Sequence, residues 1–344
     1  MADGTQDGTE ASLVAERHGV RSSVIAGAAA AVFQTTMSHP FEFLKTGQQL
    51  HRALPGAAAF NMLHPFKYYF SGCAALNVGT LLKTGTRFAT FEQACVWLRD
   101  PEHADQPIAG PRLLLAGAIT GFLESLWVVP FESIKTTAVE NALELSRRVQ
   151  GEPETRAAAV SKGPAPKATF HAARPVQTAH ERWLLHYERQ PSSHFAGTVL
   201  EIYRTRGVRG FLQGAMPTIF RQLGNSVVRF TTYAWIVQSL SPHKALDEYQ
   251  AFAAGALSSA AVVALTQPID VIKTRMQSKT AWFTYKSSLN CAYRIFVEEG
   301  FRYMWKGWVP RLFKVSLSGG ISFGVYQYVE NLVLLWEHER SLAP

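Results

Sequence analysis

The sequence repeats one short motif three times, and each copy follows an apolar stretch. The motif is Pro-x-acid-x-x-Lys, and its copies begin at Pro40, Pro130 and Pro268. Proline lacks an N–H and its ring clashes with the preceding turn, so each copy bends or breaks its helix. The acid and the lysine lie three residues apart, on one side of the continuing helix. Three copies, each after an apolar stretch, indicate a repeat architecture.

Composition and charge narrow the class of protein. Of the 344 residues, 47% are hydrophobic and 17% are charged, whereas soluble proteins usually have about a quarter charged residues. The formal net charge of +8 favours an anionic partner, which could be nucleic acid, anionic lipid or a small anion. Nucleic acid is disfavoured, because the bases lie within apolar stretches and not on a polar stripe.

The chemistry-bearing residues show no pattern of an enzyme. Three widely spaced cysteines, Cys73, Cys95 and Cys291, argue against a disulfide framework and against a zinc site. Nothing suggests covalent catalysis, a metal site or a phosphate loop. We therefore expect a protein that is not an enzyme and that needs no cofactor.

Six apolar stretches are long enough to cross a bilayer, which takes about 20 helical residues. They cover residues 24–44, 73–98, 113–139, 215–240, 249–277 and 309–336. Short amphipathic helices are expected within 50–70, 195–203 and 286–299. The acidic first twenty residues resemble neither a transit peptide nor a signal peptide, so a membrane location depends on the internal spans.

The predicted fold is an all-α membrane protein with six transmembrane helices in three pseudo-symmetric repeats. Residues 1–20 form a polar tail, 21–104 the first repeat, 105–240 the second and 245–337 the third. The second repeat is longer because of residues 141–190, which are rich in Ala, Pro, Arg, Glu and His. We expect this insertion to be a solvated, partly disordered tether. Regulation or contact with cardiolipin is the alternative role for its basic residues.

A second signature follows the third motif, with Glu299-Gly300, four further residues, and then Trp305-Lys306-Gly307. Together with the tripled motif, it resembles the mitochondrial carrier family over residues 21–337, apart from the insertion. The first two repeats depart from this signature, because Phe70-Ser71-Gly72 lacks the basic residue and Leu212-Gln213-Gly214 lacks both the aromatic and the basic residue.

Within that family, the sequence is similar to the tricarboxylate (citrate) carriers. The runs that carry this similarity are Pro40-Phe41-Glu42-Phe43-Leu44-Lys45-Thr46, Lys83 with Arg87-Phe88, Pro130 to Lys135, Arg221-Gln222 with Arg229-Phe230, and Val309-Pro310-Arg311-Leu312.

The resemblance implies a fold, a location and a mode of action. Six tilted helices surround a central cavity, and three short amphipathic helices lie on the matrix side of the mitochondrial inner membrane. Both termini face the intermembrane space, and substrate is exchanged by alternating access. The implied partners are small organic anions and membrane lipid, cardiolipin in particular, and the protein is expected to be a monomer.

The resemblance also implies that the six motif charges form a ring that closes the matrix end. Charges inside membrane helices are costly unless they pair or face water. The structural alternative is that they are helix-end charges reaching the lipid headgroups. The implied pairs are Glu42 with Lys135, Glu132 with Lys273, and Asp270 with Lys45.

Two further features of the gates follow from the resemblance. Gln48 takes the place of the family's glutamine brace, and the equivalent positions, Ala138 and Met276, suggest one brace at most. On the opposite side, the aromatic-acid-x-x-base pattern keeps only one acid in register, Glu92. The hypothesis is that packing holds the outer gate, so that the resting protein favours the state closed toward the matrix.

A second set of bases has no acids in register, and six of them would make a strongly positive cavity. Arginine forks and lysine point charges suit carboxylates, and a tri-anion needs several. The resemblance places Gly79, Arg221, Gln222 and Lys314 against the substrate, with Gly79 leaving room for a bulky carboxylate. Asn225 and Gln222 could bond a substrate hydroxyl. The full candidate set is Gly79, Lys83, Arg87, Arg221, Gln222, Asn225, Arg229, Arg311 and Lys314.

Some positions keep alternatives open. Individual bases could instead pair with Glu124 or Glu92, or line the cavity only as steering charge, and the Pro-Arg pair at Arg311 could be structural. Glu124 could also be a proton site that lets a proton accompany the anion. Ser318 stands where citrate carriers tend to have an acid.

The function predicted from these features is an antiporter for citrate, isocitrate or cis-aconitate against malate or another organic anion. One alternative is a dicarboxylate or oxoglutarate exchanger, since Arg221 and Gln222 would also suit a keto acid. The other is a carrier-like membrane protein that no longer transports and serves as an interaction partner.

Overall fold

A computed structural model describes residues 4–52, 59–98, 111–150, 179–240 and 248–318, together with single positions between 321 and 332. The described residues contain helices and loops and no strand. The long helices are α1 (Gly4–Leu50), α2 (Cys73–Leu98), α3 (Pro111–Val149), α7 (Ala215–Leu240) and α8 (Glu248–Gln277). A further helix begins at residue 308 and continues through residue 318.

Short helices connect the long ones. They are η1 (Phe66–Phe70), α5 (Ala179–Arg189), α6 (Phe195–Arg206), η3 (Val208–Leu212), α9 (Ala281–Thr284), α10 (Ser288–Arg294), the π-helical turn η4 (Ile295–Glu299) and η5 (Phe301–Trp305). We name three units by the motif helix that opens each one. The first unit runs from α1 to α2, the second from α3 to α7, and the third from α8 through the helix that begins at residue 308.

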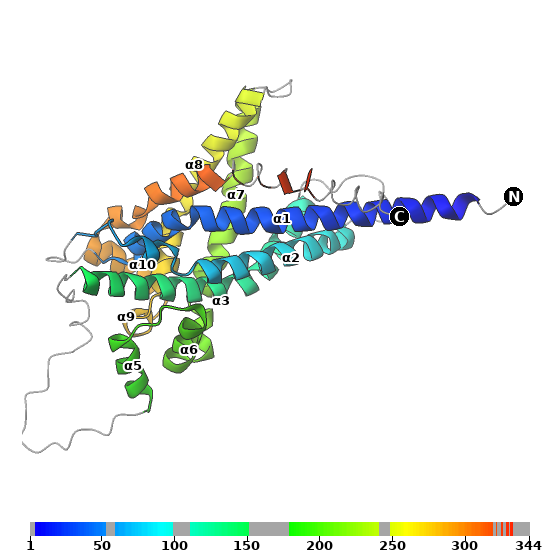
Figure 1. The fold of residues 1–344 in the computed structure, drawn as a ribbon. Helices are drawn as coiled ribbons and strands as arrows, with labels where there is room; N and C mark the ends of the chain where they lie inside the picture. The colour runs from blue at the N-terminus through cyan, green and yellow to red at the C-terminus, as the bar shows by residue number, and fades with distance from the viewer. Residues whose placement is uncertain are drawn as a thin grey trace, which may run out of the picture.

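The units are arranged so that their motif helices converge at one end. α1, α2 and α3 lie along one another, while α7 and α8 form a second pair that diverges from them (Figure 1). The helices α5, α6, α9 and α10 gather where α1, α3 and α8 terminate (Figure 1). The motif charges therefore meet at the narrow end of the helix assembly, next to the short helices.

The motif prolines lie inside continuous helices and do not end them. Pro40, Pro130 and Pro268 are internal to α1, α3 and α8. In two units the residue before the proline binds the turn that precedes the next long helix. A ring nitrogen of His39 lies 2.7 Å from the Tyr69 carbonyl oxygen, and Gln267 donates to the Lys306 carbonyl at 2.8 Å. These bonds fix α1 and α8 relative to their own connecting segments.

Three glycines join each unit to the next one. Gly72, Gly214 and Gly307 have φ angles of +87°, +74° and +82°, in the left-handed region that favours glycine. A Cβ on each would lie 3.1–3.3 Å from the carbonyl oxygen of a motif lysine in another unit. The contacts run cyclically, from Gly72 to Lys135, from Gly214 to Lys273 and from Gly307 to Lys45.

The expected insertion at 141–190 is helical at both of its ends. α3 continues to Val149, and α5 forms at Ala179–Arg189, while residues 151–178 lie outside the described residues. α5 is held by a buried Tyr187 and by the Arg204 guanidinium, 4.1 Å from the Trp183 ring centroid. Average composition concealed these amphipathic segments. The predicted polar tail is also mostly helical, because α1 begins at Gly4.

Two helical segments among the described residues are long and apolar enough to cross a membrane, Leu115–Val149 and Gly255–Gln277. They belong to α3 and α8, two of the three motif helices. The arrangement of six spans in three repeats stays a prediction.

The unit-to-unit glycine contacts predict a selective loss of stability. Gly307→Ala forces a side chain into a left-handed backbone position against Lys45, at a cost of about 1–3 kcal/mol. The purified protein should therefore unfold at a lower temperature. Gly117→Ala is the matched control, since a Cβ at this helical glycine would meet nothing within 4 Å. Equal unfolding temperatures for the two variants would contradict the proposed contact.

Candidate functional site

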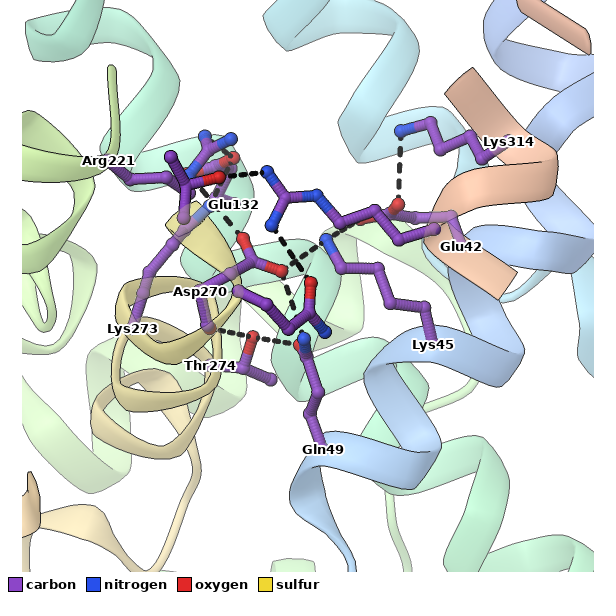
Figure 2. A network of polar contacts seen from close by, with 12 residues as sticks. Glu42, Lys45, Gln49, Glu132, Arg221, Asp270, Lys273, Thr274 and Lys314 are labelled. Atoms are coloured by element: carbon purple, nitrogen blue, oxygen red, sulfur yellow. Dashed lines mark hydrogen bonds and ion pairs between the residues drawn. The ribbon is translucent and has the colours of Figure 1, made fainter. Parts of the chain in front are cut away.

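Three ion pairs between the units form a closed ring at the converging end. Lys135 Nζ lies 2.6 Å from Glu42 Oε1, and Lys45 Nζ lies 2.6 Å from Asp270 Oδ2. Lys273 Nζ completes the ring at 2.5 Å from Glu132 Oε1. The expected pairs are thus all present, and Figure 2 shows the side chains of α1 and α8 turned toward one another.

Partners within one motif are farther apart than partners between units. Lys45 Nζ is 3.8 Å from Glu42 Oε1 on its own helix, against 2.6 Å from Asp270 on α8. The ring side chains are largely buried. Because desolvation offsets much of the attraction in buried pairs, the ring contributes more to selecting this arrangement of helices than to the free energy of folding.

The glutamine that braces the ring is Gln49, and the prediction of Gln48 is wrong. Gln49 Nε2 donates to Asp270 Oδ2 at 2.9 Å, and its Oε1 accepts from Thr274 at 2.7 Å (Figure 2). Gln48 is half-buried and lines a lateral groove with Phe41 and Leu44. The spacing explains the difference, because residues 42, 45 and 49 form one helical stripe and residues 41, 44 and 48 form the neighbouring stripe.

Gln277 stands at the equivalent position of α8 and reproduces half of the brace, because its Nε2 has no hydrogen-bond partner among the described residues. The expectation of one brace at most therefore stays a prediction. Gln277 follows Lys273 at the same interval at which Gln49 follows Lys45. Its Oε1 accepts from Thr136 Oγ1 at 3.1 Å, just as Gln49 accepts from Thr274. The corresponding residue of α3 is Val139. A comparison of the three motifs at this interval would have found both glutamines in the sequence.

Two of the predicted substrate bases lie against the ring. Arg221 Nη2 is 3.2 Å from Glu132 Oε1, and Arg221 Nε is 3.6 Å from Asp270 Oδ1. Lys314 Nζ is 3.0 Å from Glu42 Oε2 (Figure 2). Each ring carboxylate therefore has a second cation besides its lysine. Among the described side chains of this network, five cations contact three carboxylates, which leaves two positive charges in excess.

Arg311 is held by two residues of α8 and by Asn225 of α7. Arg311 donates to Gln267 Oε1 at 2.9 Å, to Thr266 Oγ1 at 2.7 Å and to Asn225 Oδ1 at 3.3 Å. Arg311 is buried. These bonds connect α7, α8 and the helix that begins at residue 308, which agrees with the structural alternative for the Pro-Arg pair.

Two of the predicted residues of α2, Lys83 and Gly79, contact α3. Lys83 Nζ lies 3.5 Å from Glu124 Oε2, and the Lys83 side chain is 35% exposed while that of Glu124 is 7% exposed. Pairing with Glu124 was one of the open alternatives for this base. A Cβ at Gly79 would lie 2.8 Å from Phe131 Cβ. Gly79 thus permits close packing of α2 on α3, and the expectation that it leaves room for substrate is wrong.

The structure shows few contacts for the remaining predicted residues. Gln222 is half-buried on α7. The side chains of Arg87, Arg229 and Glu92 lie outside the part of the chain that the structure describes, as do residues 233, 234, 237, 326, 327 and 330 of the expected outer-gate pattern.

Comparison with known proteins identifies the family of this chain. The model of the mitochondrial carrier protein family matches residues 16–102, 169–244 and 245–335. An uncharacterized mitochondrial carrier of Saccharomyces cerevisiae is 41% identical over 90% of this chain and 94% of its own length. Mitochondrial citrate transporter A of Aspergillus niger is 35% identical over 89% of both chains. The tricarboxylate transport protein of Saccharomyces cerevisiae is 31% identical over 91% of this chain and 95% of its own length.

The chain belongs to the mitochondrial carrier family. It is therefore a transporter of the mitochondrial inner membrane and not an enzyme.

The position of the brace predicts different effects for two adjacent glutamines. Gln49→Ala removes a bond to a buried carboxylate and a bond to Thr274, so the variant should lose about 1–3 kcal/mol of stability. Gln48→Ala, in the lateral groove, should change stability little. Thermal unfolding of the purified variants measures both effects. A larger loss for Gln48→Ala than for Gln49→Ala would contradict the assigned brace.

Proposed function

We propose that the protein exchanges tricarboxylates such as citrate, isocitrate or cis-aconitate for malate or another organic anion by alternating access. In this proposal six helices in three repeats span the inner membrane, and both termini face the intermembrane space. The ion-pair ring is the matrix gate, which is closed in this structure. The citrate and tricarboxylate transporters among the relatives support this substrate class.

The observation that carries the proposal is the excess of cations around the ring. Arg221 and Lys314 contact Glu132, Asp270 and Glu42 with the same groups that would bind substrate carboxylates. Two positive charges in excess next to the ring attract an anion with at least two carboxylates. Arginine offers a carboxylate two parallel donors, and lysine offers a mobile point charge.

The shared contacts give substrate a direct influence on the gate. When Arg221 and Lys314 bind substrate carboxylates, the ring acids lose one of their two cations. The ring pairs are then weaker, and because desolvation already offsets much of their attraction, a small loss is enough to favour opening. Differential binding of this kind is what a ligand needs in order to shift a conformational equilibrium.

The choice between a tricarboxylate and a dicarboxylate depends on a third cation. Arg221 and Lys314 alone satisfy a dicarboxylate, which keeps the dicarboxylate or oxoglutarate exchanger as the second candidate. The third carboxylate of citrate would need Lys83, whose side chain is partly exposed beside Glu124. Exchange of Glu124 for a substrate carboxylate would keep the charge on Lys83 compensated.

Membrane lipid is the second proposed partner of a monomeric protein. A lateral groove of about 810 Å³ lies between α1 and the third unit. Its aromatic walls suit acyl chains, while two basic residues suit the phosphates of an anionic lipid such as cardiolipin. The residues of the groove that carry this match are Phe41, Phe301, Arg302, Trp305, Lys306 and Phe313.

Transport by liposomes tests the proposed substrate and the role of the bases. Purified protein in citrate-loaded liposomes should take up labelled citrate, and a panel of internal anions ranks the counter-substrates. Arg221→Gln or Lys314→Gln should each reduce citrate exchange by about tenfold to a hundredfold, because the lost charge-assisted bond is worth roughly 1.5–3 kcal/mol. Lys286→Gln, on the exposed loop before α10, should transport normally.

Two controls make the result decisive. Thermal unfolding of each variant shows whether it is folded, and Arg221→Lys tests whether the charge alone restores part of the exchange. Efficient malate or oxoglutarate exchange without any citrate uptake would favour the dicarboxylate candidate. Absence of exchange with every di- and tricarboxylate would rule out both candidates.

A further inference from the structure

Of the three motif helices, α3 extends much farther beyond the ring than α1 and α8 do. α1 ends at Leu50 and α8 at Gln277, each within about a turn and a half of its motif lysine. α3 ends at Val149, about four turns beyond Lys135. The additional segment, residues 139–149, lies on the far side of the ring from the bases Arg221 and Lys314.

One side of this segment packs on the first unit through apolar contacts. Val139, Ala142 and Leu143 form a buried cluster with Phe43 and Tyr68. A Cβ at Gly47 of α1 would lie 3.3 Å from Leu143 Cδ1, so the two helices are in close contact. A polar contact continues this side, because a ring nitrogen of His64 lies 2.8 Å from Ser146 Oγ.

The other side of the segment faces the third unit and binds it through the carboxylate of Glu140. Glu140 Oε1 accepts from Ser278 Oγ at 3.1 Å, and Glu140 Oε2 accepts from the Lys279 backbone N–H at 2.8 Å. Both donors belong to the turn that connects α8 to α9. The carboxylate of Glu140 thus ties the end of one motif helix to the exit from another.

A buried carboxylate of α6 reinforces the same junction. Glu201 is 2% exposed, and its Oε1 lies 2.6 Å from Lys279 Nζ. Its Oε2 accepts from Asn141 Nδ2 at 2.8 Å. Lys279 therefore receives one carboxylate on its backbone and another on its side chain, both from the second unit.

We propose that residues 139–149 of α3 form a latch, which closes the matrix exit a second time beyond the ion-pair ring and must release residues 278–280 before the matrix side opens. The proposal rests on the exchange function proposed above. It assigns Glu140 and Lys279 as residues that set the ease of matrix opening and that do not touch the transported anion.

The chemistry of the two sides determines which contact releases. If the segment separated from Phe43 and Tyr68, its apolar side chains would be exposed to water, which is unfavourable. The hydrogen bonds of Glu140 and Lys279 can be exchanged for bonds to water at a small net cost. The latch therefore stays on the first unit and separates from the third.

Accessibility of a residue between the ring and the latch tests the proposal without any transported substrate. Thr136 lies on α3 between Lys135 and Glu140 and is 1% exposed. In the chain with Cys73→Ser, Cys95→Ser and Thr136→Cys, an impermeant maleimide is applied from the matrix side in inside-out membrane vesicles. Cys291 can stay, because burial raises the pKa of its thiol to about 12 and keeps it protonated and unreactive.

Removal of the latch carboxylate should expose this thiol. Adding Glu140→Ala should raise the labelling rate about fivefold or more, since two hydrogen bonds that favour the closed state are lost. Glu188→Ala is the control, because Glu188 is an exposed carboxylate on α5, outside residues 139–149 and 278–280. Equal labelling rates in the Glu140→Ala and Glu188→Ala chains would overturn the latch.

A reversible cross-link tests whether release is required for exchange. Glu140→Cys and Ser278→Cys, joined by a bis-methanethiosulfonate reagent, should stop citrate exchange, and reduction should restore it. The control link joins Arg148→Cys to Arg189→Cys, two residues of the second unit whose contact is a 2.7 Å bond from Arg148 to the Arg189 carbonyl. Undiminished exchange with the 140–278 link in place would overturn the latch.

The labelling and cross-linking experiments also distinguish failure of the latch from failure of the proposed function. If the unsubstituted protein exchanges no anion, the proposed exchange is contradicted, and the labelling of residue 136 alone decides on the latch. If the protein exchanges citrate, the latch stands only if Glu140→Ala speeds the labelling and the 140–278 link stops exchange.

Discussion

The need to pair buried charges holds the motif helices together. An acid and a lysine three residues apart on one helix do not satisfy each other, as the 3.8 Å separation of Glu42 and Lys45 shows. Each reaches instead for a neighbouring unit, and this is possible for all six only if the three helices close into a ring. The glycines that contact the lysine backbones follow the same cyclic order. Charge pairing and close backbone packing thus specify the same neighbours.

Closure of the ring also places the proposed substrate bases. Arg221 and Lys314 lie on helices that follow the motif helices, yet both contact ring carboxylates. If these two bases bind the transported anion as proposed, the ring carboxylates lie next to the positions that the anion would take. The proposed binding site and gate would then need no separate relay, because both would depend on the same few charges.

Sequence reasoning succeeded where one periodicity decides the outcome. The tripled spacing was enough to predict three equivalent helices, and the resemblance to the carrier family supplied which acid pairs with which lysine. It failed for Gln48 and Gly79, where the question is which helix lies opposite a given face. Gln49 lies on the charged stripe of α1, a distinction of one residue, and Gly79 faces Phe131 because α2 packs closely on α3 at that point. The helical ends of the insertion were missed because composition averages over buried and exposed positions.

The three junctions of the ring are consequently unequal. Gln49 braces the junction of the first and third units, and Gln277 occupies the same place between the third and second units. Between the second and first units, the equivalent residue is Val139, which packs in the apolar cluster with Phe43 and Tyr68. This junction has the ion pair of Glu42 with Lys135 as well, but it adds apolar contacts, which, unlike hydrogen bonds, water cannot replace. Opening toward the matrix should therefore separate the third unit from its neighbours first, while the first and second units move together.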